Sequence, residues 1–164
     1  MTTTNATATT TQVFRVYINA PAQKVWDAIT DPEWNARYGY HSRQEFELRP
    51  GGAYRAFASE DMASHGAPNV IIDGEVLEVD PPRKLVQTWH AMFDEATSAE
   101  PPTRLTWELA ERGGVTELTV THNLEGAPAT LSIVSGAQAE AGGGWAMIVS
   151  DLKTLLETGK TLDF

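Results

Sequence analysis

Residues 142–159 constrain the fold of this chain more than any other stretch. They begin with three glycines, and their apolar residues then recur at steps of three and four: Trp145, Ile148, Val149, Leu152, Leu155 and Leu156. This spacing predicts a long helix with one buried face. Most of residues 44–122 has the pattern of strands, so the partner of that face is expected to be an antiparallel sheet curved around the helix. Such a sheet tends to leave a cavity, which makes ligand binding the leading question.

The rest of the chain is organised mainly as strands. Residue patterns predict strands at residues 12–19, 44–48, 53–59, 70–79, 84–91, 104–109 and 116–122. Turn residues at 50–52, 80–83 and 112–114 favour sequential hairpins and hence a meander. Two short helices are expected after the first strand, at about residues 21–29 and 32–37. Residues 60–69, 93–102 and 124–141 are expected to be irregular and to hold an entrance or lid.

Length and composition exclude several classes of protein. At 164 residues and 41% apolar residues, the chain is expected to form one domain over residues 12–164, preceded by a disordered Thr-rich tail at residues 1–11. Its 12 basic and 22 acidic residues give a formal charge of −10, which opposes binding to nucleic acid. No apolar run is long enough to span a membrane, and the lack of cysteine fits a reducing cytoplasm. We therefore expect a cytoplasmic monomer.

Strand alternation also predicts which side chains face the interior. Residues 104–109 place Leu105, Trp107 and Leu109 on one face, and His122 shares a face with apolar neighbours. The faces of residues 84–91 are mixed, and we expect Trp89 to point inward. The alternative is that the large rings only fill the core. The residues expected to line a ligand cavity are Trp34, Tyr38, Trp89, Trp107, His122, Trp145, Val149 and Leu152.

Few residues suggest catalysis. No two histidines have the spacing of a metal site, and the sequence contains no nucleophile elbow or phosphate-binding loop, so neither a metal nor a cofactor is expected. His122 is the best candidate for an acid/base or hydrogen-bonding role, with a structural histidine as the alternative. Arg55 is a candidate for orienting a carbonyl or carboxylate, with a solvated strand arginine as the alternative. Residues 142–144 are expected to be a hinge rather than an anion site.

Five short motifs, in order along the chain, together resemble a known family. They are residues 20–32 (APAQKVWDAITDP), 49–52 (RPGG), 74–89 (beginning GEVLEVDPPRKL and ending in Thr88-Trp89), 119–122 (TVTH) and 143–159. The chain is similar to the heat-shock-protein-90 ATPase activator homologue family of the START-like, or SRPBCC, superfamily. The resemblance implies an α+β helix-grip fold, in which six or seven antiparallel strands wrap around the C-terminal helix, two short helices follow the first strand, and a deep cavity lies inside.

The resemblance leaves three hypotheses for function. Members of the superfamily bind lipids, polyketides or other apolar molecules, so the first is a protein that holds an apolar or aromatic ligand. Some relatives are cyclases, aromatases or hydrolases, so the second is an enzyme that uses His122 or Arg55. The family name comes from co-chaperones, so the third is an interaction module for a chaperone. The family has no universal catalytic residue to transfer, and fold alone does not set function.

Overall fold

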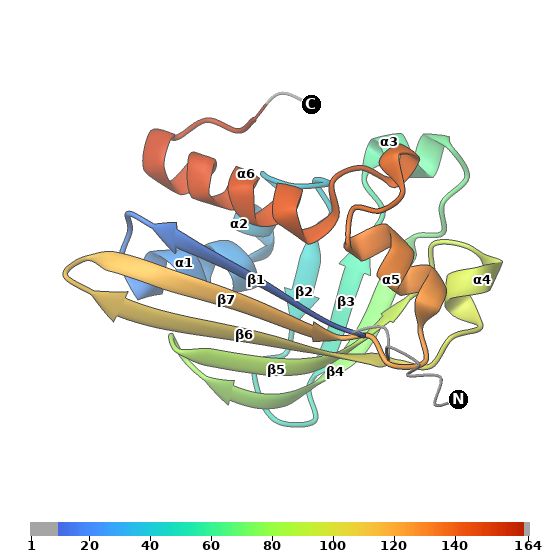
Figure 1. Ribbon diagram of the computed structural model, residues 1–164, viewed down its shortest axis with the longest axis horizontal. Coiled ribbons are helices and arrows are strands. Elements are labelled where there is room, and N and C mark those ends of the chain that lie inside the picture. Colours follow the sequence, from blue (N-terminus) through green and yellow to red (C-terminus); the bar gives the residue numbers. More distant parts are fainter. Residues whose placement is uncertain (1–9, 163–164) are drawn as a thin grey trace, which may run out of the picture.

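One antiparallel sheet of seven strands forms the body of the protein. The computed structural model describes residues 10–162. The strands are β1 (Thr11–Ile18), β2 (Gln44–Phe46), β3 (Ala53–Phe57), β4 (Val70–Asp80), β5 (Lys84–Ala91), β6 (Thr103–Arg112) and β7 (Val115–Asn123). Their order in the sheet is β1-β7-β6-β5-β4-β3-β2, so β1 and β2 form the two edges (Figure 1). The expected α+β class and the meander from β2 to β7 are confirmed.

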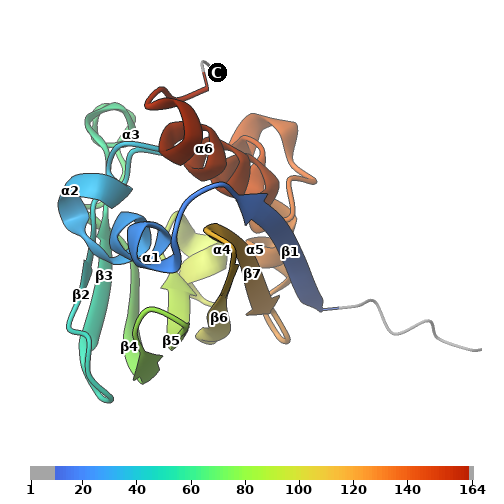
Figure 2. The ribbon, with the colours of Figure 1, turned by 90° about the vertical axis from the view of Figure 1, so that its left-hand side faces the viewer.

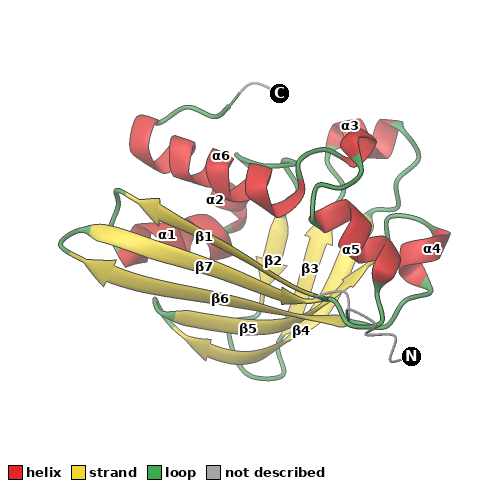
Figure 3. Ribbon diagram, in the orientation of Figure 1, coloured by secondary structure: helices red, strands yellow, loops and turns green. Residues whose placement is uncertain are grey.

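The helices lie on the concave side of this sheet and at its ends (Figure 3). They are α1 (Ala22–Thr30), α2 (Pro32–Asn35), α3 (Glu60–Ser64), α4 (Glu95–Ser98), α5 (Pro128–Val134) and α6 (Gly144–Thr158), with a 3-10 turn at Ala139–Ala141. Figure 2 shows the sheet curving beneath α6, with α2 near the β2 edge and α1 inside the curve of the sheet. Within residues 10–162, no helix is long and apolar enough to cross a membrane.

The long helix has the buried face that its sequence predicts. Trp145, Val149, Leu152 and Leu155 are buried, whereas the polar residues of its other side are exposed or half-buried, except for the buried Asp151. The helix ends at Gly159, whose φ of +77° is a left-handed conformation that glycine adopts without strain. The inward faces of the strands are also confirmed, because Leu105, Trp107, Leu109, Leu118, Val120, His122 and Trp89 are all buried.

The expectation that three segments would be irregular is wrong, because each contains a short helix. Ser59 caps α3 by accepting a hydrogen bond from the amide of Met62, and Asp94 and Thr97 form a capping box around α4. α5 begins at Pro128, where the fixed φ of proline suits the first helical position. Thr11 belongs to β1 rather than to a tail, because it pairs with Asn123. The rest of the expected tail, residues 1–9, lies outside the described residues.

Gly144 allows α5 and α6 to meet closely. Its φ is +63°, and a Cβ atom there would lie 2.2 Å from the carbonyl oxygen of Val134. Real Cβ atoms do not approach a backbone oxygen so closely, so only glycine fits this position without a shift. The glycine run before α6 therefore contributes a tight contact between two helices.

Candidate functional site

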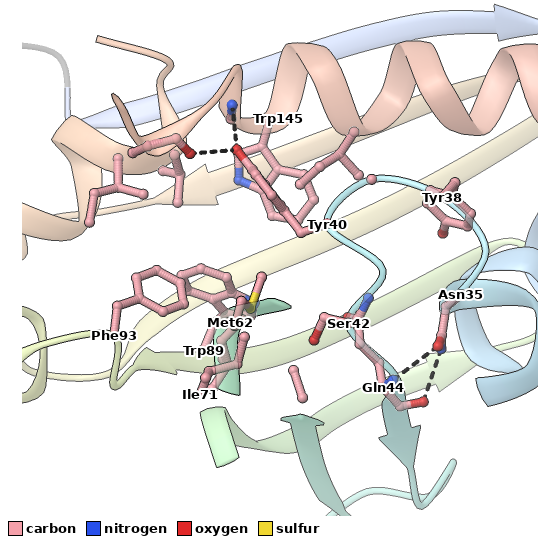
Figure 4. A pocket seen from close by; sticks show the side chains of 18 of the residues that line it. Asn35, Tyr38, Tyr40, Ser42, Gln44, Met62, Ile71, Trp89, Phe93 and Trp145 are labelled. Carbon is pink, nitrogen blue, oxygen red and sulfur yellow. Dashed lines mark hydrogen bonds between the residues drawn. The ribbon is translucent and has the colours of Figure 1, made fainter. Parts of the chain in front are cut away.

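A pocket of about 310 Å³ lies between the sheet and the N-terminal half of α6. The β3, β4 and β5 strands form its floor, and α5, α6 and the segment from Tyr38 to Ser42 surround it (Figure 4). No described residue that lines it carries a formal charge at neutral pH. The lining residues are Asn35, Tyr38, Gly39, Tyr40, Ser42, Gln44, Ala56, Met62, Ala67, Ile71, Ile72, Trp89, Phe93, Trp107, Ile133, Val134, Ala141, Gly144, Trp145 and Ile148.

Aromatic rings form a continuous part of the pocket wall. The centroids of Trp89 and Trp145 lie 6.3 Å apart, and Trp107 meets Trp145 edge to face at 5.4 Å. Phe93 extends this group through an edge contact with Trp89 at 6.1 Å. Edge and tilted contacts are the favoured arrangements of aromatic pairs, so these rings support one another while their remaining faces border the pocket.

His122 lies behind this wall and connects two of its rings. An indole N–H can only donate, so Nδ1 of His122 accepts the hydrogen bond from Nε1 of Trp145, at 3.0 Å. Nε2 then carries the proton and donates to Oγ1 of Thr103 at 2.7 Å, and this hydroxyl donates to the carbonyl oxygen of Trp89 at 2.6 Å. Burial lowers the pKa of His122 to about 3. The ring is therefore neutral near pH 7, with both nitrogens occupied.

The pocket includes four of the residues expected to line it: Tyr38, Trp89, Trp107 and Trp145. The other four, Trp34, His122, Val149 and Leu152, are not among the lining residues.

Each of these four residues has a different environment. Trp34 is half-buried on α2, with the guanidinium of Arg37 4.4 Å from its ring centroid. His122 is fully buried behind the Trp145 indole. Val149 and Leu152 belong to the core beyond the pocket, because only the first turns of α6 border the cavity, ending at Ile148.

Arg55 does not face the pocket. It is exposed, whereas its neighbours Tyr54 and Ala56 are buried on the opposite face of β3. The alternation of a strand therefore directs its side chain away from the cavity.

The residues expected from the sequence to line the cavity do not include many of those that form the pocket wall. Ile72 and Ala56 lie on buried faces of predicted strands, and their alternation was a usable signal. Met62, Phe93 and Ile133 come from segments expected to be irregular. Their part in the wall depends on how these segments fold back over the sheet, which no local pattern records.

The segment from Tyr38 to Ser42 is fastened to α6 at two points. The hydroxyl of Tyr40 donates to the carbonyl oxygen of Ala141 and accepts from the amide of Gly144, both at 3.0 Å (Figure 4). The buried carboxylate of Asp151 accepts from the amide of Gly39 at 2.8 Å and from that of Leu162 at 2.7 Å. These bonds hold one side of the pocket wall.

Glu100 fastens the other side. Its carboxylate accepts hydrogen bonds from the amides of Ala129 and Thr130, at 2.7 and 2.9 Å, and from the hydroxyl of Thr130 at 2.7 Å. These donors lie in the first turn of α5, where a negative charge is favourable. Because α5 supplies Ile133 and Val134 to the pocket, Glu100 fixes that part of the wall.

A comparison with protein families matches most of the chain. Residues 19–157 match the model described as activator of Hsp90 ATPase homolog 1-like protein. The chain belongs to this family. No curated protein matches the sequence.

Solved structures show that the family fold is shared. CalU16 from Micromonospora echinospora has a TM-score of 0.64 and 23% identity, over 92% of this chain and 76% of that one. DynU16, a protein of the dynemicin biosynthetic locus, has a TM-score of 0.65 and 27% identity, over 92% of this chain but 48% of that one. The Aha1 dimer from Colwellia psychrerythraea has a TM-score of 0.62 and 17% identity, over 92% and 98%.

Proposed function

We propose that this family member binds an uncharged, largely apolar or aromatic small molecule, such as a lipid, a polyketide or a similar metabolite, in the pocket beneath α6. The observation that carries the proposal is a wall of tryptophan rings without any charged residue around about 310 Å³. A volume near the lower end of the usual range for ligand sites suits a compact molecule. A charged ligand would lose its hydration there without gaining an ionic partner.

The same features favour binding over catalysis. A general acid or base needs a titratable group that reaches the substrate. The two nitrogens of His122 are occupied by Trp145 and Thr103, and Arg55 lies on the outer face of β3. The hydroxyls of Tyr38 and Tyr40 donate to backbone carbonyls. An enzyme working in this pocket would have to use other groups.

The relatives suggest where the ligand comes from. DynU16 belongs to a biosynthetic locus, and CalU16 has the same fold. We therefore favour a biosynthetic metabolite, held in the cytoplasm, where a chain without cysteine is suited to reducing conditions.

A neutral fluorescent probe tests the proposal. N-phenyl-1-naphthylamine should bind with a rise in its emission and quench the tryptophans of the wall. Ala67→Phe places a ring in the pocket and should weaken binding about tenfold or more, since bulk removes the space that the probe needs. Ala63→Phe, an exposed position on α3 outside the lining, is the matched control.

Two results would count against the proposal. If Ala67→Phe does not change the affinity for the probe, the probe binds outside this pocket. If none of a panel of neutral aromatic compounds binds, the proposed function is wrong. Stimulation of a host Hsp90 ATPase by the purified chain, unaffected by Ala67→Phe, would favour the chaperone role that the family description suggests.

A further inference from the structure

Gln44 carries an unused hydrogen-bond donor on the pocket wall. Its Oε1 accepts a hydrogen bond from the hydroxyl of Tyr54 at 2.7 Å, whereas its Nε2 has no partner among the described residues. The other amide and hydroxyl side chains of the wall donate their protons to the protein. The amide of Asn35 bonds the backbone of Gln44 and Ile29, and the hydroxyl of Ser42 donates to the carbonyl oxygen of Phe57 (Figure 4).

A second glutamine also has an unused donor. Gln87 is fully buried on β5, and its Oε1 accepts from the indole N–H of Trp107 at 3.1 Å. Its Nε2 has no hydrogen-bond partner, and it is the one buried side-chain polar atom within residues 10–162 in that condition. Burial raises the pKa of the Tyr54 hydroxyl, and the side chains of Trp89 and Gln87 lower it to a smaller extent.

Two pairs on this side of the protein therefore share one feature. Trp107 donates to Gln87 and Tyr54 donates to Gln44, and in each glutamine the amide oxygen is occupied while the amide nitrogen has no hydrogen-bond partner among the described residues. Nε2 of Gln87 is buried away from the pocket, whereas Gln44 is half-buried and lines it. A ligand that covers Nε2 of Gln44 without offering an acceptor would leave a desolvated donor unsatisfied, which is costly. A bound ligand with an oxygen acceptor would give Nε2 of Gln44 its missing hydrogen-bond partner.

We infer that the ligand is a neutral aromatic carbonyl compound, such as an aryl ketone or quinone, whose oxygen accepts a hydrogen bond from Nε2 of Gln44 beside the tryptophan wall. This inference rests on the proposed function and specifies its ligand class. A carboxylate would also accept the bond, but no cation lines the pocket to balance its charge. A plain hydrocarbon would leave the donor unsatisfied.

Matched probes test the inference. 2-Acetylnaphthalene and 2-ethylnaphthalene have the same ring and similar size, and only the first carries a carbonyl; 2-naphthoate adds the charge. Calorimetry on the full chain should give about tenfold tighter binding for the ketone than for the hydrocarbon, as expected for one net hydrogen bond, and weaker binding for the carboxylate. The carbonyl stretch of the bound ketone should shift to lower frequency than in hexane.

Gln44→Leu should reduce the preference for the ketone to less than twofold and return its carbonyl stretch toward the hexane value. Gln23→Leu, an exposed glutamine on α1, should keep both properties. Equal binding of ketone and hydrocarbon by the natural sequence, or an unshifted stretch, overturns the inference while leaving the proposed function intact. Binding of neither probe overturns both. The infrared measurement needs no variant, so it decides the matter even if Gln44→Leu fails to fold.

Discussion

His122 shows how far alternation along a strand identifies the role of a side chain. The pattern of β7 correctly places this residue on the inner face. Alternation cannot show whether an inward side chain reaches the pocket or stays behind its wall. The imidazole of His122 lies behind the pocket wall, where its two nitrogens form hydrogen bonds with Trp145 and Thr103. Its hydrogen bonds are those of the structural histidine that was the alternative interpretation. The partners come from α6 and β6, which are distant in sequence, so no local pattern names them.

The buried imidazole should make stability depend on pH. Folding lowers the pKa of His122 from 6.5 to about 3, so between these values the unfolded chain binds the proton and the folded protein does not. The contribution of this residue is fully present above pH 6.5 and decreases as the pH falls toward 3. Between pH 7.5 and 5.0 it should account for a loss of about 2 kcal/mol in the free energy of unfolding.

Urea denaturation at the two pH values measures this loss. In His122→Gln the difference between pH 7.5 and 5.0 should be smaller by about that amount, whereas His65→Gln, at an exposed site, should keep it. An NMR titration in which the ring of His122 changes charge near pH 6.5 in the folded protein would show the explanation to be wrong.

Among the elements, the longer strands and α6 were predictable because their apolar residues repeat with a regular period. The short helix α2 was predictable from Asp31 and Pro32, which mark a helix start. By contrast, α3, α4 and α5 have four to seven residues, fewer than two full turns. Caps and contacts with the sheet stabilise them. Because these helices, or residues beside them, supply Met62, Phe93 and Ile133, this part of the pocket wall was missed.

The crossing of α5 and α6 should depend on Gly144. Gly144→Ala and Gly113→Ala both place a side chain at positive φ, +63° and +59°, but only the first meets atoms of another segment. Gly113→Ala should lower the free energy of unfolding by about 1–2 kcal/mol, through backbone strain alone. Gly144→Ala should cost roughly 1–3 kcal/mol more, because the new methyl group clashes with the Val134 carbonyl.

Denaturant melts of the two variants give the comparison directly, and Gly113→Ala serves as the control for backbone strain. If both variants lose the same free energy of unfolding, α5 moves aside without cost, and the close contact between α5 and α6 does not contribute to stability.

Across the whole molecule, Asp151 joins segments that are far apart in the sequence. Its carboxylate accepts hydrogen bonds from the amides of Gly39, in the pocket wall, and Leu162, beyond the end of α6. Asp151→Ala would leave both amides without their charged acceptor, so we expect a loss of about 2–4 kcal/mol in the free energy of unfolding. Hydrogen exchange of the Gly39 and Leu162 amides should accelerate together.

Asp27→Ala is the matched control, because Asp27 is exposed and accepts one hydrogen bond, from Gln23 in the same helix. It should change the stability by less than about 0.5 kcal/mol. If Asp151→Ala changed stability no more than the control, the carboxylate would not be what holds these segments together.

The overall architecture was accessible from the sequence because its motifs occur in the family's order, and the family match covers residues 19–157. The hydrogen-bonding groups of the pocket could not be predicted from the sequence. The chemistry there depends on Gln44, an uncharged residue that no motif marks, and on Tyr54, whose hydroxyl occupies the amide oxygen of Gln44.

The strand order also bears on how the chain folds during its synthesis. β1 is completed early, but its partner in the sheet is β7, and Ile18 pairs with Thr116. At about 5–20 residues per second, a ribosome needs roughly 5–20 s to make the intervening chain. During that interval β1 has no native neighbour in the sheet, while β2 to β6 can already pair in sequence. The sheet should therefore grow from its middle hairpins, and its first strand should join last.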